Sequence, residues 1–216
     1  MSAALSAARP RRGRFEGPRL VAASALALAA LCLALVAGQG TDEPGLRALV
    51  RWTARFGLVC FLAAYVASSL RRLWPVPATA WLLRNRRWIG LSFAVAQAAH
   101  ALAIALLARR LGPAFRTEPI SLAGGALGYA FTVALAATSS DRATAWLGAR
   151  RWRVLHRAGV TWIWIVYAVT EVPSALRSPV HSALSALVVG AALLRLAAWR
   201  AGRVRRSDAA AAGAMR

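Results

Sequence analysis

Six apolar segments dominate this sequence of 216 residues, and each is long enough to cross a lipid bilayer. They cover residues 20–38, 55–70, 88–107, 120–139, 154–170 and 180–198. A helix rises about 1.5 Å per residue, so about 20 residues cross the roughly 30 Å of hydrocarbon. The composition agrees, because 59% of the residues are hydrophobic, above the share of about half found in soluble domains. We therefore predict an all-α integral membrane protein, folded as a six-helix transmembrane bundle.

The basic charge is spread unevenly over the connections between these segments. All 28 basic residues are arginine, and the net charge is +21. The side that carries both termini holds 21 of these arginines, and the opposite side holds 7. By the positive-inside rule, this asymmetry predicts that both termini are cytoplasmic in a multi-pass protein of the cytoplasmic (inner) membrane. We expect the charge to set the topology and to attract membrane lipid, with no binding of nucleic acid.

The sequence divides into three regions. Residues 1–19 are predicted to form a basic cytoplasmic N-terminal tail, residues 20–200 the transmembrane domain, and residues 201–216 a basic, disordered C-terminal tail. The first apolar segment follows an arginine cluster and also fits a secretory signal peptide. Its length and the five segments that follow favour an uncleaved helix. No connection is long enough for a flavin- or nicotinamide-binding domain, so an electron donor is expected to be quinone or a separate protein.

The acidic residues exclude several classes of function. All of them lie in connections or at the ends of predicted helices: Glu16, Asp42, Glu43, Glu118, Asp141, Glu171 and Asp208. Because a proton or ion pathway needs ionisable groups within the membrane, their position disfavours a coupled transporter. The sequence also lacks a catalytic carboxylate pair, a nucleophile with its base and a phosphate-binding glycine loop. Any reductase activity is therefore expected to belong to a complex.

Two of the three histidines are candidates for a functional role. His100 lies inside the third apolar segment, and His156 lies at the start of the fifth, each after a cluster of arginines. An imidazole in hydrocarbon is uncommon and usually serves as a ligand or a proton carrier. His181, at the outer start of the sixth segment, is more typical of an interfacial residue.

The residues around both histidines resemble a known family. The first stretch is Arg86-Arg87-Trp88-Ile89-Gly90-Leu91, followed by Phe93 and His100; the second is Leu135 with the residues up to Asp141, then Leu147-Gly148 and Trp152-Arg153-Val154-Leu155-His156-Arg157. Both resemble motifs of ferric reductase-like transmembrane domains. The similarity is to the short bacterial members, such as the haem-binding membrane subunit of the periplasmic methionine-sulfoxide reductase system.

The resemblance implies a b-type haem and a role in electron transport. In such domains two imidazoles hold one iron from opposite faces, and arginines near the haem bind its propionates. Carried over to this chain, the ligands are His100 and His156, with Arg87 and Arg153 as cofactor-binding candidates. The protein would then pass electrons from a separate donor, quinone or a flavoprotein, to an acceptor, as the haem-carrying part of an oxidoreductase system.

The sequence departs from the family where a second ligand is expected on each helix. Histidines four turns apart hold two haems in the family, but four turns after His156 stands Val169, and four turns before His100 stands Arg87. Along their helices His100 lies about 18 Å deep and His156 only about 3 Å. Three interpretations follow: one haem shared after a helix shift, haem on His100 with another partner such as His181 or with none, or a cofactor-free scaffold or partner-binding subunit.

Overall fold

The computed structural model describes the chain from residue 16 to residue 214, and its side chains as far as residue 204. Within that part the structure is helical, and six helices are long and apolar enough to cross a membrane. They are α1 Pro18–Gln39, α2 Glu43–Leu73, α4 Arg86–Leu111, α5 Pro119–Ala137, α7 Ala149–Glu171 and α8 Pro179–Ala214. Two short helices, α3 Pro77–Arg84 and α6 Asp141–Leu147, and two 3-10 turns, Gly112–Ala114 and Val172–Arg177, connect them. The predicted all-helical fold with six helices able to span a membrane is confirmed for the described residues.

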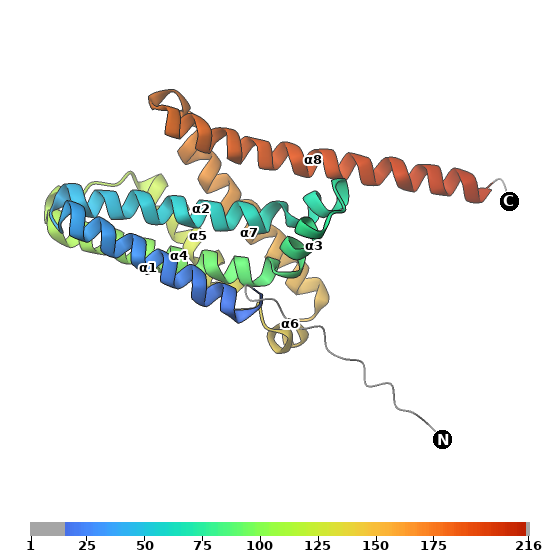
Figure 1. The fold of residues 1–216 in the computed structure, drawn as a ribbon, viewed down its shortest axis with the longest axis horizontal. Helices are drawn as coiled ribbons and strands as arrows, with labels where there is room; N and C mark the ends of the chain where they lie inside the picture. Colours follow the sequence, from blue (N-terminus) through green and yellow to red (C-terminus); the bar gives the residue numbers. More distant parts are fainter. Residues whose placement is uncertain (1–15, 215–216) are drawn as a thin grey trace, which may run out of the picture.

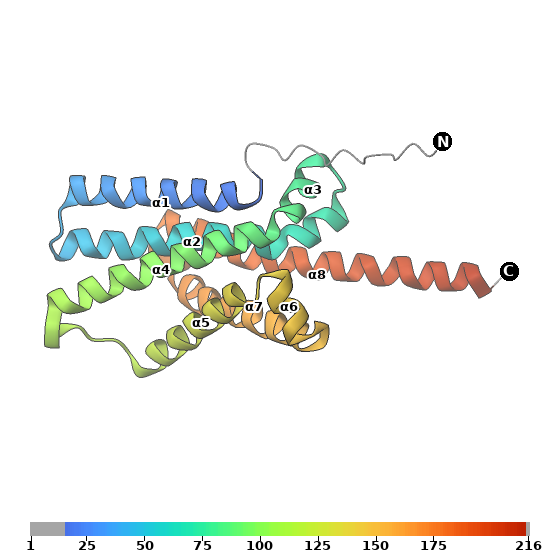
Figure 2. The same cartoon turned by 90° about the horizontal axis from the view of Figure 1, so that it is seen from below.

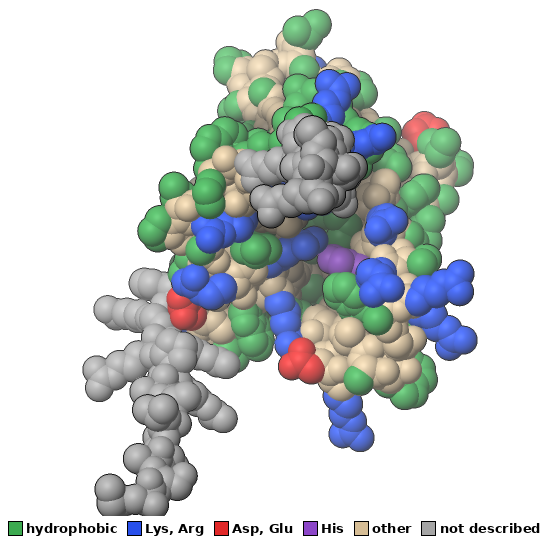
Figure 3. Space-filling view, turned by 90° about the vertical axis from the view of Figure 1, so that its right-hand side faces the viewer, with side chains coloured by type: hydrophobic (Ala, Val, Ile, Leu, Met, Phe, Trp, Pro, Cys, Tyr) green, Lys and Arg blue, Asp and Glu red, His purple; other side chains and the backbone are tan. Residues whose placement is uncertain are grey.

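The six long helices run up and down around α2. Helices α1, α4 and α8 pack against α2, whereas α5 pairs with α7 (Figures 1 and 2). The start of α1 and the end of α8 lie at one end of the bundle, together with α3 and α6 (Figure 1). Arginine side chains gather over this end around a histidine (Figure 3). We call it the arginine-rich end.

An aromatic cluster joins four of the helices. Phe61 of α2 lies at the centre, with ring centroids 5.5 Å from Phe93 of α4 and 5.6 Å from Tyr167 of α7. Val188 of α8 is fully buried in the same cluster. Gly159 allows α5 and α7 to approach closely, because a Cβ there would lie 3.0 Å from Leu135 Cδ1. The helices that frame the cavity described below are held together by these contacts.

Helix α2 begins twelve residues before the predicted segment. Asp42 caps it by accepting a hydrogen bond from the amide of Gly45, and Pro44 lies in the first turn, where proline is tolerated. The arginines of this stretch lower its hydropathy, although Leu46 and Leu49 are buried. The additional turns bring Thr53 into the core of the bundle.

The two predicted tails can be compared with the structure only at the C-terminal end. Most of the predicted N-terminal tail, residues 1–15, lies outside the described residues. At the other end, α8 continues to Ala214, whereas a disordered tail was predicted from residue 201. Alanine is the strongest helix former, and the run from Ala209 to Ala212 extends the helix.

Candidate functional site

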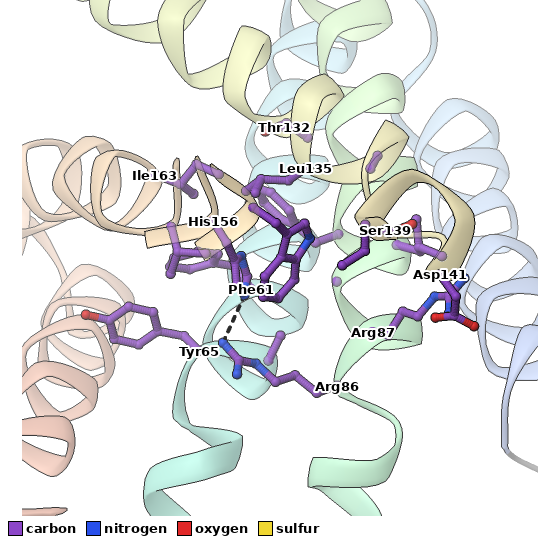
Figure 4. A pocket seen from close by; sticks show the side chains of 18 residues that line it. Phe61, Tyr65, Arg86, Arg87, Thr132, Leu135, Ser139, Asp141, His156 and Ile163 are labelled. Carbon is purple, nitrogen blue, oxygen red and sulfur yellow. Dashed lines mark hydrogen bonds and ion pairs between the residues drawn. The ribbon is translucent and has the colours of Figure 1, made fainter. Parts of the chain in front are cut away.

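A cavity of about 400 Å³ opens at the arginine-rich end between α2, α4, α5 and α7. Its walls are mainly apolar, with Phe61, Leu135 and Ile163 among the lining side chains (Figure 4). Small residues, which include Ala64 and Gly90, widen it. A Cβ on Gly90 would meet no atom within 4 Å. A flat ligand could therefore approach the backbone of α4 at this position.

His156 projects into this cavity from the second turn of α7 (Figure 4). Its Nε2 lies 3.3 Å from Nη2 of Arg86. Because a guanidinium can only donate, Nε2 is the acceptor and the proton of the neutral ring lies on Nδ1. The ring also packs on Trp152, with centroids 4.9 Å apart, and the indole of Trp152 donates to the carbonyl of Thr138 at 3.2 Å. These contacts orient the nitrogen that a metal would need.

The rim of the cavity is basic. Arg87 pairs with Asp141 at 3.0 Å, and the Asp141 side chain is 99% exposed. The Nε atom of Arg87 is buried without a hydrogen-bond partner. Arg195 of α8 lies 4.2 Å from the ring centroid of Tyr65, which lines the cavity. Guanidinium groups therefore lie at or near the mouth of an apolar cavity, with Arg87 paired to Asp141 and Arg195 donating a hydrogen bond to the carbonyl of Tyr65 at 3.1 Å.

His100 does not line this cavity. It lies on α4, and its Nδ1 is 3.1 Å from the hydroxyl of Thr53. Thr53 is only 1% exposed and donates its hydroxyl proton to the carbonyl of Leu49 at 2.7 Å. It must therefore accept from His100, which puts the proton on Nδ1 and leaves the lone pair on Nε2.

The register between α4 and α7 sets the depths of the two histidines. Arg86 meets His156, a separation of 70 residues. About three turns further along both helices, Gln97 of α4 and Tyr167 of α7 meet in the same way. Their side-chain oxygens both lie within 3.2 Å of the position that a Cβ on Gly57 would take, and the two residues are again 70 positions apart. His100 is consequently level with Thr170 rather than with His156. Fourteen residues of helix correspond to about 21 Å of depth, so these histidines cannot share one iron in this arrangement.

The other candidates lie apart from the cavity. His181 sits in the first turn of α8, at the opposite end of the bundle, with its Nδ1 2.9 Å from the hydroxyl of Ser178. Arg153 faces a separate groove on the outer surface of α5 and α7. The structure thus brings together His156 and Arg87, and places His100 and Arg153 elsewhere. Among the described residues no group of three His, Cys, Asp or Glu side chains could hold a metal ion.

A second polar cluster lies between the cavity and the opposite end of the bundle. Four oxygen atoms in this region are buried and lack a hydrogen-bond partner: Gln97 Oε1, Tyr129 OH, Tyr167 OH and Glu171 Oε2. Tyr167 is 8% exposed. Leaving such atoms unpaired is unfavourable, so these positions are suited to bound water. From the sequence, Glu171 was expected only at the end of a helix, and this cluster was not predicted.

Three residues near the histidines were not among the predicted candidates. Arg86, which was not a candidate, contacts the imidazole of His156, whereas Arg87, a candidate for binding the cofactor, lines the same cavity. Arg195 was counted with the terminal arginines, although its position between apolar residues in a membrane-spanning helix is a recognisable signal of a functional charge. Thr53 was overlooked because the predicted second segment began after it.

Comparison with known proteins adds independent information. The chain is 33% identical over 132 residues to the protein-methionine-sulfoxide reductase heme-binding subunit MsrQ of Ralstonia nicotianae. It is 34% identical over 128 residues to the subunits of the same name from Bordetella parapertussis and Bordetella pertussis. This chain is similar to these subunits. The resemblance expected from the sequence motifs is confirmed to that extent.

The matched region is part of each chain. It covers 58% of this chain and 59% of the Ralstonia protein, and 57% of this chain and 60% of the Bordetella parapertussis protein. The chain therefore spans about three fifths of the length of the curated relatives that it matches. No protein-family model matches the sequence, and no solved structure matches it significantly.

Proposed function

We propose that the protein is a ferric reductase-like, membrane-embedded electron-transfer subunit that binds b-type haem in the cavity around His156. The observation that carries the proposal is the position of this imidazole, which faces an apolar cavity with guanidinium groups at its mouth. The similarity to heme-binding subunits supports the same ligand. Both termini are proposed to be cytoplasmic, which puts this cavity near the cytoplasmic face of the inner membrane.

The residues present fit a haem that would be held by the imidazole of His156. The small side chain of Ala64 and the absence of one at Gly90 leave room beside the helix backbones, and the lone pair of His156 Nε2 is directed to the cavity mouth. Arg86 and Arg87 are placed to bind propionates once Arg86 turns away from the imidazole. When bound, haem supplies a one-electron redox centre, and its potential depends on its ligands and surroundings.

Electrons would have to come from outside the chain. We propose a separate donor, quinone or a flavoprotein, and an acceptor protein that is a methionine-sulfoxide reductase, as the names of the relatives suggest. Phe61 and Ile163 give the cavity apolar walls, and the aromatic cluster keeps their helices in register. His100 is proposed to act in packing through Thr53, or as a ligand of a second haem at its own depth.

A second candidate function is a cofactor-free scaffold or partner-binding subunit. It is favoured by the lack of a second histidine among the described residues that line the cavity. Arg86 also occupies the ligand nitrogen of His156. Val169 stands where the family pattern places a ligand, and it is 65% exposed on α7.

An absorption spectrum separates the two candidates. The full chain, expressed with ample haem supply and purified in detergent, is measured oxidised and then reduced with dithionite. A b-type spectrum on reduction supports the electron-transfer subunit. A helical, monodisperse preparation without that spectrum would reject it in favour of the scaffold.

A further inference from the structure

A second hollow lies on the outer surface of the bundle, along α5 and α7. This groove has a volume of about 650 Å³. The residues that α7 contributes lie three or four positions apart, and so form one stripe on the helix: Arg150, Arg153, Val154, Arg157, Ala158, Thr161, Trp162 and Ile165. His156 is on the other side of the same helix, facing the cavity.

The basic end of the groove has no counter-charge. Arg150, Arg153 and Arg157 are all exposed. None of the three forms an ion pair or donates a hydrogen bond to another residue in the described part of the chain. Three guanidiniums on adjacent turns repel one another, and an anion placed among them would relieve this repulsion. A phosphate fits the geometry and charge of guanidinium groups.

The remainder of the groove is apolar and leads toward the middle of the membrane. Val154 and Ile165 of α7 and Leu127 of α5 expose much of their side chains. Trp162 is fixed across the groove, because its indole donates to the carbonyl of Gly124 at 3.1 Å. From Arg153 to Ile165 the helix rises about 18 Å, close to half of the roughly 30 Å hydrocarbon thickness. The groove therefore matches one leaflet in length.

We propose that this groove binds an anionic phospholipid, with the phosphate among Arg150, Arg153 and Arg157 and an acyl chain along Val154, Ala158 and Ile165. Basic pockets between transmembrane helices are suited to such head groups. The site is separate from the His156 cavity and does not depend on haem. It gives Arg153 a ligand other than a haem propionate.

The test is native mass spectrometry of the full chain in detergent, titrated with phosphatidylglycerol or phosphatidylcholine. An arginine near an anionic lipid contributes about fivefold in affinity. The variant R150Q/R153Q/R157Q should therefore lose roughly 100-fold in affinity for phosphatidylglycerol. The matched control R109Q/R110Q/R116Q removes three charges at the opposite end of the bundle and should retain the wild-type preference.

A second variant tests the apolar half of the groove without changing its charge. Ala158→Trp fills the groove and should lower the affinity for phosphatidylglycerol while circular dichroism stays helical. The proposal is overturned if the wild type binds both lipids equally, or if the triple variant behaves like its control. It is also overturned if Ala158→Trp leaves binding unchanged and inorganic phosphate displaces the lipid, since the site would then accept free phosphate.

Discussion

The hydrogen bond between Thr53 and His100 provides a test of what His100 does. In Thr53→Val the hydroxyl is lost with little change in volume, and the carbonyl of Leu49 keeps its bond within the helix. The Nδ1–H of His100 donates to Thr53 at 3.1 Å in the wild type. In the variant this N–H loses that acceptor at a buried position, since Thr53 is only 1% exposed. Loss of a buried partner costs about 1–3 kcal/mol, and hydrogen bonds between membrane helices average about 0.6 kcal/mol with a maximum near 1.7.

We therefore expect Thr53→Val to lower the free energy of unfolding by about 1–2 kcal/mol. His100→Leu removes the other partner, and the double variant completes a cycle in which the coupling energy should be close to 1 kcal/mol. Unfolding in mixed micelles with increasing sodium dodecyl sulfate, followed by circular dichroism, measures all four proteins. A coupling energy below about 0.3 kcal/mol, the limit of additivity for independent sites, would refute the structural role of this hydrogen bond.

Three further predictions concern the cavity and its surroundings. Gly90→Leu should leave the stability unchanged, since a Cβ there meets nothing within 4 Å, but should abolish haem uptake measured by absorbance; Gly125→Leu, outside the cavity, is the control. Tyr167→Phe removes a buried hydroxyl that has no protein partner and is suited to bound water, so it should lower the free energy of unfolding by about 1 kcal/mol in thermal unfolding; an unchanged or raised melting temperature would show that no water is bound there. Asp141→Asn breaks an ion pair in which Asp141 is 99% exposed, so its melting temperature should match that of wild type, whereas a clear loss would mean that Arg87 depends on this carboxylate.

The membrane-spanning architecture was predictable because hydrocarbon imposes a length on each helix. The predicted and observed spans agree within a few residues at most boundaries, for example residues 88–107 against Arg86–Leu111. The start of α2 was not predictable from hydropathy, since Arg47 and Arg51 mask a buried stripe that contains Leu46 and Leu49. The short helices α3 and α6, of eight and seven residues, are too short for a hydropathy average over the length of a membrane span to detect them.

The site was predictable in part. Helix spacing predicted that His100 lies much deeper than His156, and the contact of His156 with Arg86, fourteen residues before His100, agrees with that depth difference. The identity of the contacting arginine depends on side-chain direction, which spacing over four turns does not resolve. The partnership of Thr53 with His100 depends on where α2 begins, and the buried oxygens of Gln97 and Tyr167 depend on the close approach of helices at Gly57.

The most direct test of the account compares reduced-minus-oxidised spectra of the wild-type protein with those of His156→Ala, His100→Ala and His181→Ala. All four are purified in parallel, with haem content expressed per folded protein. We predict that His156→Ala alone loses the b-type signal of the cavity haem and that His181→Ala matches wild type. Loss of all haem in His100→Ala with full retention in His156→Ala would contradict the assignment of the haem to the His156 cavity.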